Sequence, residues 1–110
     1  MTVQHKELAA GRWNTLSLVE QMAHVGSEVE RTIAWRSKGR DDIGMRAFER
    51  TLELLDLAIA DGKNRGRLKE LCRVRELLVD HFCFDNEYQS NDQSWQRYFL
   101  QFAVAARAGR

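Results

Sequence analysis

The chain has 110 residues, of which 44% are hydrophobic and 30% are charged, and its formal net charge is +1. This length suits one domain that can bury about two thirds of its surface. The balanced charge excludes a strongly basic nucleic-acid coat protein. Neither the roughly 18 apolar residues of a membrane span nor the apolar core of a secretory signal is present, so we expect no membrane partner.

The chain contains no proline. Proline is expelled from helix interiors at a cost of about 3 kcal/mol, and a proline-free chain rich in Leu, Ala, Arg and Glu is typical of an all-helical protein. Cys72 and Cys83 would lie about 16 Å apart on one helix, which is too far for a disulfide. We therefore expect two free, buried thiols in a protein of the reducing cytoplasm.

Hydrophobic residues recur at helical spacing in four segments. The predicted helices cover about residues 4–37, 42–60, 67–84 and 91–107. Because the connections are short, neighbouring helices must run antiparallel, and we expect a single-domain, all-α, up-down four-helix bundle. The first helix, if continuous, would reach about 50 Å and overhang the others. A second copy of the chain is the simplest cover for that overhang.

Individual residues mark the helix ends and one helix contact. Gly26 lies on the apolar stripe of the first helix, where it predicts the close approach of another helix. Gly39 suits the left-handed conformation that ends a helix, and Asp41 or Asp42 is expected to cap the next one. Ser90 is expected to open the last helix through a capping box. A bend is expected at the glycine in position 11.

Neither a metal nor a cofactor is expected. Di-iron bundles carry Glu-x-x-His motifs, and this sequence has none. Glu20 and His24 are one turn apart, but they lie on the polar, solvent-facing side of the first helix, which comprises Ser17, Glu20, Gln21, His24, Ser27, Glu28 and Arg31. The two cysteines are too far apart to share a zinc ion. Phosphate loops, dinucleotide fingerprints and nucleophile elbows are absent from the sequence.

One pattern is compatible with catalysis. Arg75 and His81 form an Arg-x5-His motif in the third predicted helix, which resembles the Arg-x4-6-His signature of HEPN-type ribonucleases, small helical bundles that dimerise. The resemblance implies a composite RNA-cleaving site in which the arginine holds a phosphate and the histidine moves a proton. Glu76 stands where that family usually has a small polar residue. The structural alternative places Arg75 in an ion pair and His81 at the core boundary.

A wider likeness covers most of the chain. Segments 11–13, 20–31, 48–56, 85–88 and 98–107 resemble a group of small uncharacterised prokaryotic all-helical proteins, and this resemblance implies no activity. In size and architecture the chain is also similar to the four-helix accessory proteins of diversity-generating retroelements. Those proteins are more basic, they oligomerise, and they bind a reverse transcriptase and RNA.

Charge is unevenly distributed along the sequence. Residues 63–75 are mainly basic, and in an up-down bundle this segment begins at the same end as both termini. We predict a basic, nucleic-acid-binding pole there, and its candidate residues are Lys63, Arg65, Arg67, Lys69 and Arg107, joined by Lys6, Arg12 and Arg110. Residues 80–92 contain four carboxylates and no Lys or Arg, which predicts an acidic patch at the other pole. A basic pole with an acidic counterpart suits head-to-tail or two-fold assembly as well as the binding of RNA phosphates.

The aromatic residues exceed what one small core easily hides, and Trp13, Trp35 and Phe84 are predicted to form a partner interface. We therefore expect a homo-oligomer that acts as a non-enzymatic interaction module, for example as an accessory subunit of a nucleic-acid-processing complex, with RNA, DNA or a protein as partner. One alternative is a HEPN-like, metal-independent endoribonuclease of the toxin type that uses Arg75 and His81. Another alternative is a purely structural, self-assembling bundle.

Overall fold

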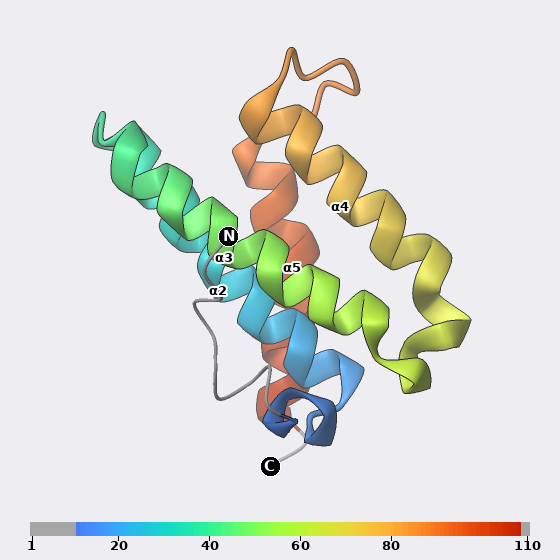
Figure 1. The fold of residues 1–110 in the computed structure, drawn as a ribbon. Coiled ribbons are helices and arrows are strands. Elements are labelled where there is room, and N and C mark those ends of the chain that lie inside the picture. The colour runs from blue at the N-terminus through green and yellow to red at the C-terminus, as the bar shows by residue number, and fades with distance from the viewer. Residues whose placement is uncertain (1–10, 109–110) are drawn as a thin grey trace.

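A computed structural model describes residues 11–108 of the chain. These residues form α-helices and short 3-10 helices and contain no strand: η1 (Arg12–Thr15), α2 (Leu18–Ser37), α3 (Asp41–Ala60), η2 (Gly62–Arg67), α4 (Leu68–Cys83) and α5 (Asp92–Ala108). Successive α-helices run in opposite directions (Figure 1). The predicted all-α, antiparallel four-helix bundle is confirmed.

The first helix is shorter than predicted. It begins at Leu18 because Ser17 forms a capping box with Glu20: Ser17 Oγ accepts from Glu20 N (3.2 Å), and Glu20 Oε1 accepts from Ser17 N (3.0 Å). Ahead of it, Gly11 has a left-handed backbone (φ +116°) and precedes η1, as the expected bend requires. The helix predicted from residue 4 is therefore wrong over residues 11–17, and residues 4–10 lie outside the described part. Without that long helix, the overhang no longer argues for a second copy.

The other helix bounds lie within one residue of those predicted, but their caps differ. Gly39 is left-handed (φ +75°), as expected. The N-cap of α3 is Arg40, which makes no side-chain capping bond; Asp41 and Asp42 both belong to the first turn. The prediction that one of these aspartates caps α3 is therefore wrong.

Helix α5 is capped one residue later than predicted. Asn91 Oδ1 accepts from Ser94 N (2.7 Å), and Ser94 Oγ accepts from Asn91 N (3.2 Å). This reciprocal pair closes the first turn in the way expected of Ser90. The Ser90 amide instead donates to Asn86 Oδ1 (2.9 Å), because the preceding loop turns back on itself.

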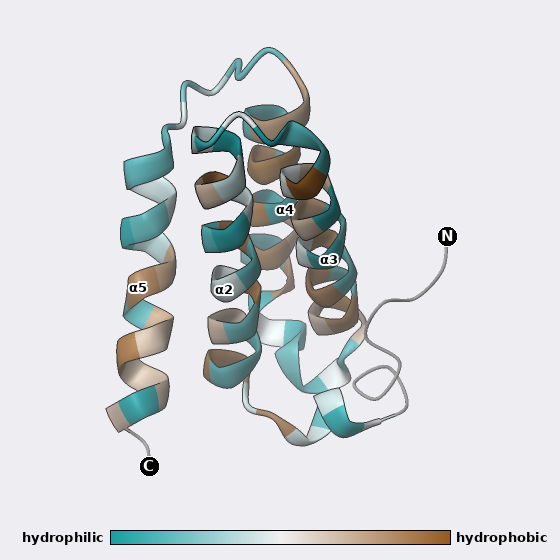
Figure 2. Cartoon of the chain, turned by 90° about the vertical axis from the view of Figure 1, so that its left-hand side faces the viewer, coloured by the Kyte–Doolittle hydropathy of each residue, from teal (hydrophilic) through white to brown (hydrophobic). Residues whose placement is uncertain are grey.

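Helix α2 is the central element. It packs extensively against both α3 and α5, whereas α4 lies at the edge of the bundle and contacts α3 and η2 (Figures 1 and 2). A Cβ atom on Gly26 of α2 would lie only 2.9 Å from Phe99 Cβ of α5. The close helix approach predicted at Gly26 is confirmed.

The core combines apolar side chains from all four α-helices with one tryptophan from η1. Trp13 is 1% exposed, so its predicted role in a partner interface is wrong. The other large core side chains are Met22, Val25, Val29, Ile33, Phe48, Leu54, Leu55, Leu71, Leu78, Phe82, Trp95, Phe99 and Phe102. Trp13 is buried because the short helix η1 directs its side chain into the hydrophobic core.

A buried polar network joins η1, α2 and η2. Gln21 Nε2 donates to Trp13 O (3.1 Å) and to Asp61 Oδ2 (2.9 Å). Asn64 Nδ2 donates to Gln21 Oε1 (2.8 Å) and to Ala58 O (2.9 Å). Gln21 and Asn64 are both buried, so the network holds η2 in place. Helix α4 begins directly after η2, and its start is therefore held as well.

Glu28 is also buried, and its carboxylate accepts from Arg31 Nη1 (2.8 Å) and Arg50 Nε (3.1 Å). The expectation that the polar side of α2 faces solvent is therefore wrong at Gln21 and Glu28. Helix α3, which contributes Arg50, covers that side. Two guanidinium partners balance the buried charge.

Candidate interaction surface on helix α4

The outer face of α4 carries two adjoining hollows of about 590 and 660 Å³, which share Cys72 and Glu76. Together they form what we call the α4 groove, which runs from η2 to the loop between α4 and α5. Its lining residues are Gly66, Arg67, Lys69, Glu70, Cys72, Arg73, Arg75, Glu76, Val79, Asp80, Phe84, Asp85, Glu87 and Tyr88. The groove is open because α4 lies at the edge of the bundle (Figure 1).

Two aromatic rings form the loop end of the groove. Phe84 is 72% exposed and Tyr88 is 48% exposed. The loop folds back along α4, so that Arg73 Cζ lies 4.8 Å from the Tyr88 ring centroid and Tyr88 Oη donates to Glu76 Oε1 (3.3 Å). An exposed phenylalanine beside a half-exposed tyrosine is typical of a surface that a partner covers. The contact of Phe84 with a partner stays a prediction.

Asp80 holds the loop in this folded-back position. Its side chain accepts from Glu87 N (2.9 Å) and Tyr88 N (3.2 Å), and its backbone oxygen accepts from Asn86 N (3.2 Å). Asn86 also adopts a left-handed backbone (φ +54°), which lets the chain reverse. The sequence places Asp80 in an acidic patch but gives no sign of this anchoring role, because the role depends on how the loop folds.

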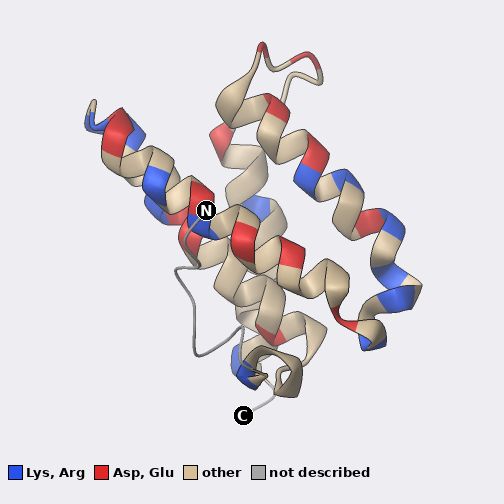
Figure 3. Cartoon of the chain, viewed as in Figure 1, with Lys and Arg blue, Asp and Glu red and all other residues tan. Residues whose placement is uncertain are grey.

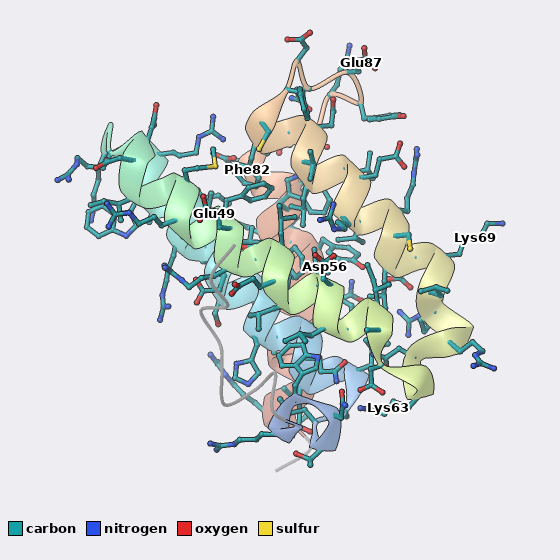
Figure 4. All side chains as sticks on the ribbon, in the orientation of Figure 1. Glu49, Asp56, Lys63, Lys69, Phe82 and Glu87 are labelled. Atoms are coloured by element: carbon teal, nitrogen blue, oxygen red, sulfur yellow. The ribbon has the colours of Figure 1, made fainter. Side chains whose placement is uncertain are left out.

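Charge changes sign along the α4 groove (Figure 3). The hollow near η2 has three cations, Arg67, Lys69 and Arg73, against two carboxylates. The hollow near the loop has one cation against four carboxylates, Glu76, Asp80, Asp85 and Glu87. In Figure 4, Lys69 projects outward from the start of α4, and Glu87 lies on the loop that follows its end. Arg67 is ion-paired with Glu70 and Arg73 with Glu76, so the start of the groove carries a small net positive charge, that of Lys69, whereas its end is acidic.

The structure does not bring Arg75 and His81 together within one chain. Arg75 is paired with Asp56 of α3, with Nε 2.7 Å from Oδ1, and it lines the α4 groove. His81 Nε2 lies 2.9 Å from Asp92 Oδ1 at the start of α5, and His81 lines a separate polar hollow. The side chain of His81 is 10% exposed. Each residue thus has its own carboxylate partner, which is the geometry of the structural alternative.

The predicted nucleic-acid-binding residues are only partly available. Lys63 is bonded to the Asp61 carboxylate and also donates to Asn14 O (3.0 Å). Arg67 is paired with Glu70, Nη2 to Oε1 at 2.6 Å. Both cations therefore already have protein partners, which lowers the free positive charge at this end.

Arg65 and Lys69 are exposed beside them. Arg107 lies elsewhere, in a hollow between α2 and α5 that Glu20 and His24 also line. The five predicted residues therefore do not form one continuous patch. Lys6 and Arg110 lie outside the described residues.

The remaining sequence predictions concern Trp35 and the two cysteines. Trp35 is half-buried, and Lys38 Nζ lies 5.1 Å from its ring centroid. Cys72 and Cys83 are free, as expected, but both are exposed, so the expected burial is wrong. Cys72 lies in the α4 groove, and partial burial raises the pKa of the Cys83 thiol.

Within residues 11–108, no three His, Cys, Asp or Glu side chains gather closely enough to hold a metal ion. None of the helices in this part of the chain is both long and apolar enough to span a membrane. No family model, no curated protein and no solved structure matches the chain. The α4 groove, with its exposed rings and divided charge, is the strongest candidate site in the described residues.

Proposed function

We propose that this protein is a non-enzymatic helical interaction module that binds a protein partner through the α4 groove. The observation that carries the proposal is the exposure of Phe84 and Tyr88 on a loop that Asp80 holds in place. A preordered aromatic surface loses little conformational entropy when a partner covers it, which favours binding. A role as accessory subunit of a larger complex, including a nucleic-acid-processing one, is consistent with such a surface.

The geometry favours this function over the ribonuclease alternative. A general base and a phosphate-binding group must reach one substrate together. Arg75 and His81 line different hollows, and each is engaged by a carboxylate, Asp56 and Asp92 respectively. A composite site across two copies would have to break these two contacts with carboxylates or include the carboxylates in the site.

Affinity capture from the native host tests the proposal with matched baits. The Phe84→Ser bait removes the most exposed ring of the groove, and a Leu100→Ser bait removes a similarly exposed apolar side chain from α5. We expect the wild-type and Leu100→Ser baits to retain the same directly bound protein and the Phe84→Ser bait to lose it. Equal capture by all three baits would refute a role for the groove.

Incubation with RNA separates the enzymatic alternative from the proposed one. The interaction module predicts no cleavage by the purified protein. Metal-independent cleavage that disappears in both Arg75→Ala and His81→Ala, with helical content unchanged, would replace our proposal with the ribonuclease.

A further inference from the structure

We infer that the occupant of the α4 groove is a second copy of this chain, bound so that the two α4 helices lie antiparallel across a twofold axis. The inference rests on the proposed function and names its partner. It follows from the way charge is arranged along α4, because a surface that is basic at one end and acidic at the other complements itself when turned around.

A twofold interface places the same patch of both copies in contact, with each contact made twice. The antiparallel arrangement brings the η2 hollow against the acidic loop hollow of the other copy. Lys69 is the main cation of the η2 hollow, because Arg67 and Arg73 already pair with Glu70 and Glu76 of their own chain. Lys69, which projects from the start of α4, then faces Glu87 of the second copy, which lies on the loop after the end of α4 (Figure 4). A parallel arrangement would oppose like charges at both ends.

The folded-back loop makes this match geometrically consistent. Glu87 N is bonded to Asp80 Oδ1, so Glu87 lies beside the last turn of α4, whereas Lys69 lies in the first turn. A twofold axis that passes between Arg75 and Glu76 places the first turn of one α4 opposite the last turn of the other. It also sets Cys72 opposite Val79 of the second copy, with Phe84 covering the start of the partner's α4.

Charge reversal at the two ends tests the arrangement in the purified full-length protein. We expect sedimentation equilibrium to show a dimer that weakens as salt rises. Lys69→Glu alone and Glu87→Lys alone should each raise the dissociation constant at least about tenfold, because symmetry makes every lost contact count twice. Arg97→Glu on α5 is the control of equal charge change and should leave the dimer intact.

Mixing the two variants gives the sharper result. In an equimolar mixture, a Lys69→Glu chain and a Glu87→Lys chain present opposite charges at both ends of the interface. They should therefore associate with each other although neither associates well with itself. If the mixture is as weak as its components while wild type dimerises, the antiparallel arrangement is wrong.

Disulfide trapping tests the register. Val79→Cys is introduced with Cys83→Ser, so that the available thiols are at positions 72 and 79. Within one chain these positions are about 10.5 Å apart along α4, which is beyond disulfide reach. We expect mild oxidation to give a covalent dimer, and the same protein with Cys72→Ser to stay uncrosslinked. A wild-type dimer whose Val79→Cys variant does not crosslink would overturn the proposed register.

The outcomes also separate this inference from the proposed function. A purified protein that stays monomeric at all salt concentrations, but still captures a different protein through Phe84, would refute self-association and leave the interaction module standing. Loss of both the dimer and the Phe84-dependent capture would remove both. A monomer that binds RNA through Lys69 would replace the second copy with nucleic acid.

Discussion

The contact between α2 and α5 at Gly26 allows a quantitative prediction for Gly26→Ala. Alanine is favoured over glycine in a helix by about 1 kcal/mol. The new methyl group, however, would lie 2.9 Å from Phe99 Cβ and 3.2 Å from Phe99 Cγ, whereas carbon atoms normally approach to about 3.5–4.0 Å. Phe99 Cβ is fixed to the α5 backbone and cannot rotate away, so α5 must withdraw.

Withdrawal of α5 opens gaps around the aromatic side chains that pack on α2. Overpacking of this kind costs about 1–3 kcal/mol. After the gain in helix propensity, Gly26→Ala should lower the free energy of unfolding by about 0–2 kcal/mol. Gly66→Ala is the matched control, since no atom lies within 4 Å of the added Cβ, and it should raise stability by about 0.4–1 kcal/mol.

Gly44→Ala supplies an intermediate case. Its nearest neighbour is Arg36 Cγ at 3.1 Å, which belongs to a flexible side chain that can move, so its net effect should be near zero. Urea unfolding followed by circular dichroism gives all three values under one set of conditions. A Gly26→Ala variant as stable as Gly66→Ala would show that α2 and α5 are not in close contact.

Three other substitutions test the network, the link between α4 and α5, and the charges of α4. Asn64→Ala leaves Gln21 Oε1 without its buried donor and should cost about 1–3 kcal/mol in urea unfolding. Tyr98→Phe removes a 2.7 Å hydrogen bond to Glu70 that, with an arginine, lowers the pKa of that carboxyl below 4.5. A carboxyl whose pKa is lower in the folded than in the unfolded state stabilises the fold at neutral pH, and this stabilisation is lost as pH falls through the folded-state pKa. Tyr98→Phe should therefore lower the free energy of unfolding by about 0.5–1.5 kcal/mol at pH 7 and by less in acid. Lys69→Glu puts an anion in the first turn of α4 and should stabilise the monomer by about 0.3–1 kcal/mol. Urea unfolding at a protein concentration too low for dimers measures this effect, and a destabilised monomer would contradict the prediction.

Much of the fold follows from local signals. Helical spacing of apolar residues located α3, α4 and α5 within one residue at each end, and the glycines at positions 26 and 39 predicted a close contact and a left-handed turn. These features are predictable because they depend on a single helix or a single backbone conformation. The cap of α5 shows the limit of such signals, since Ser90 and Asn91 offer competing caps one residue apart.

The features that sequence reasoning missed depend on tertiary contacts. Gln21 and Glu28 are as polar as any surface residue, and they are buried because α2 is covered on two sides, with partners that come from η2 and α3. Trp13 is equally unpredictable, since its burial depends on where a short 3-10 helix settles. For the site, the exposed Phe84 was expected, but its neighbour Tyr88 and the anchor Asp80 were not, because the loop reverses over α4.

Several charged residues of α4 lie at the helix end where the dipole of an isolated helix disfavours their charge. A helix carries partial positive charge at its N-terminus and partial negative charge at its C-terminus. Arg67 and Lys69 nevertheless stand at the start of α4, and Asp80 stands in its last turn with Glu87 beside it, although Glu70 and His81 at the two ends partly offset this. An antiparallel second copy offsets each of these unfavourable interactions with a favourable one, because it sets the start of one α4 beside the end of the other. The dipoles of the two helices also attract each other in this antiparallel arrangement. The distribution that is unfavourable for one chain is therefore favourable for two, which is why we assign the groove to a second copy of this chain.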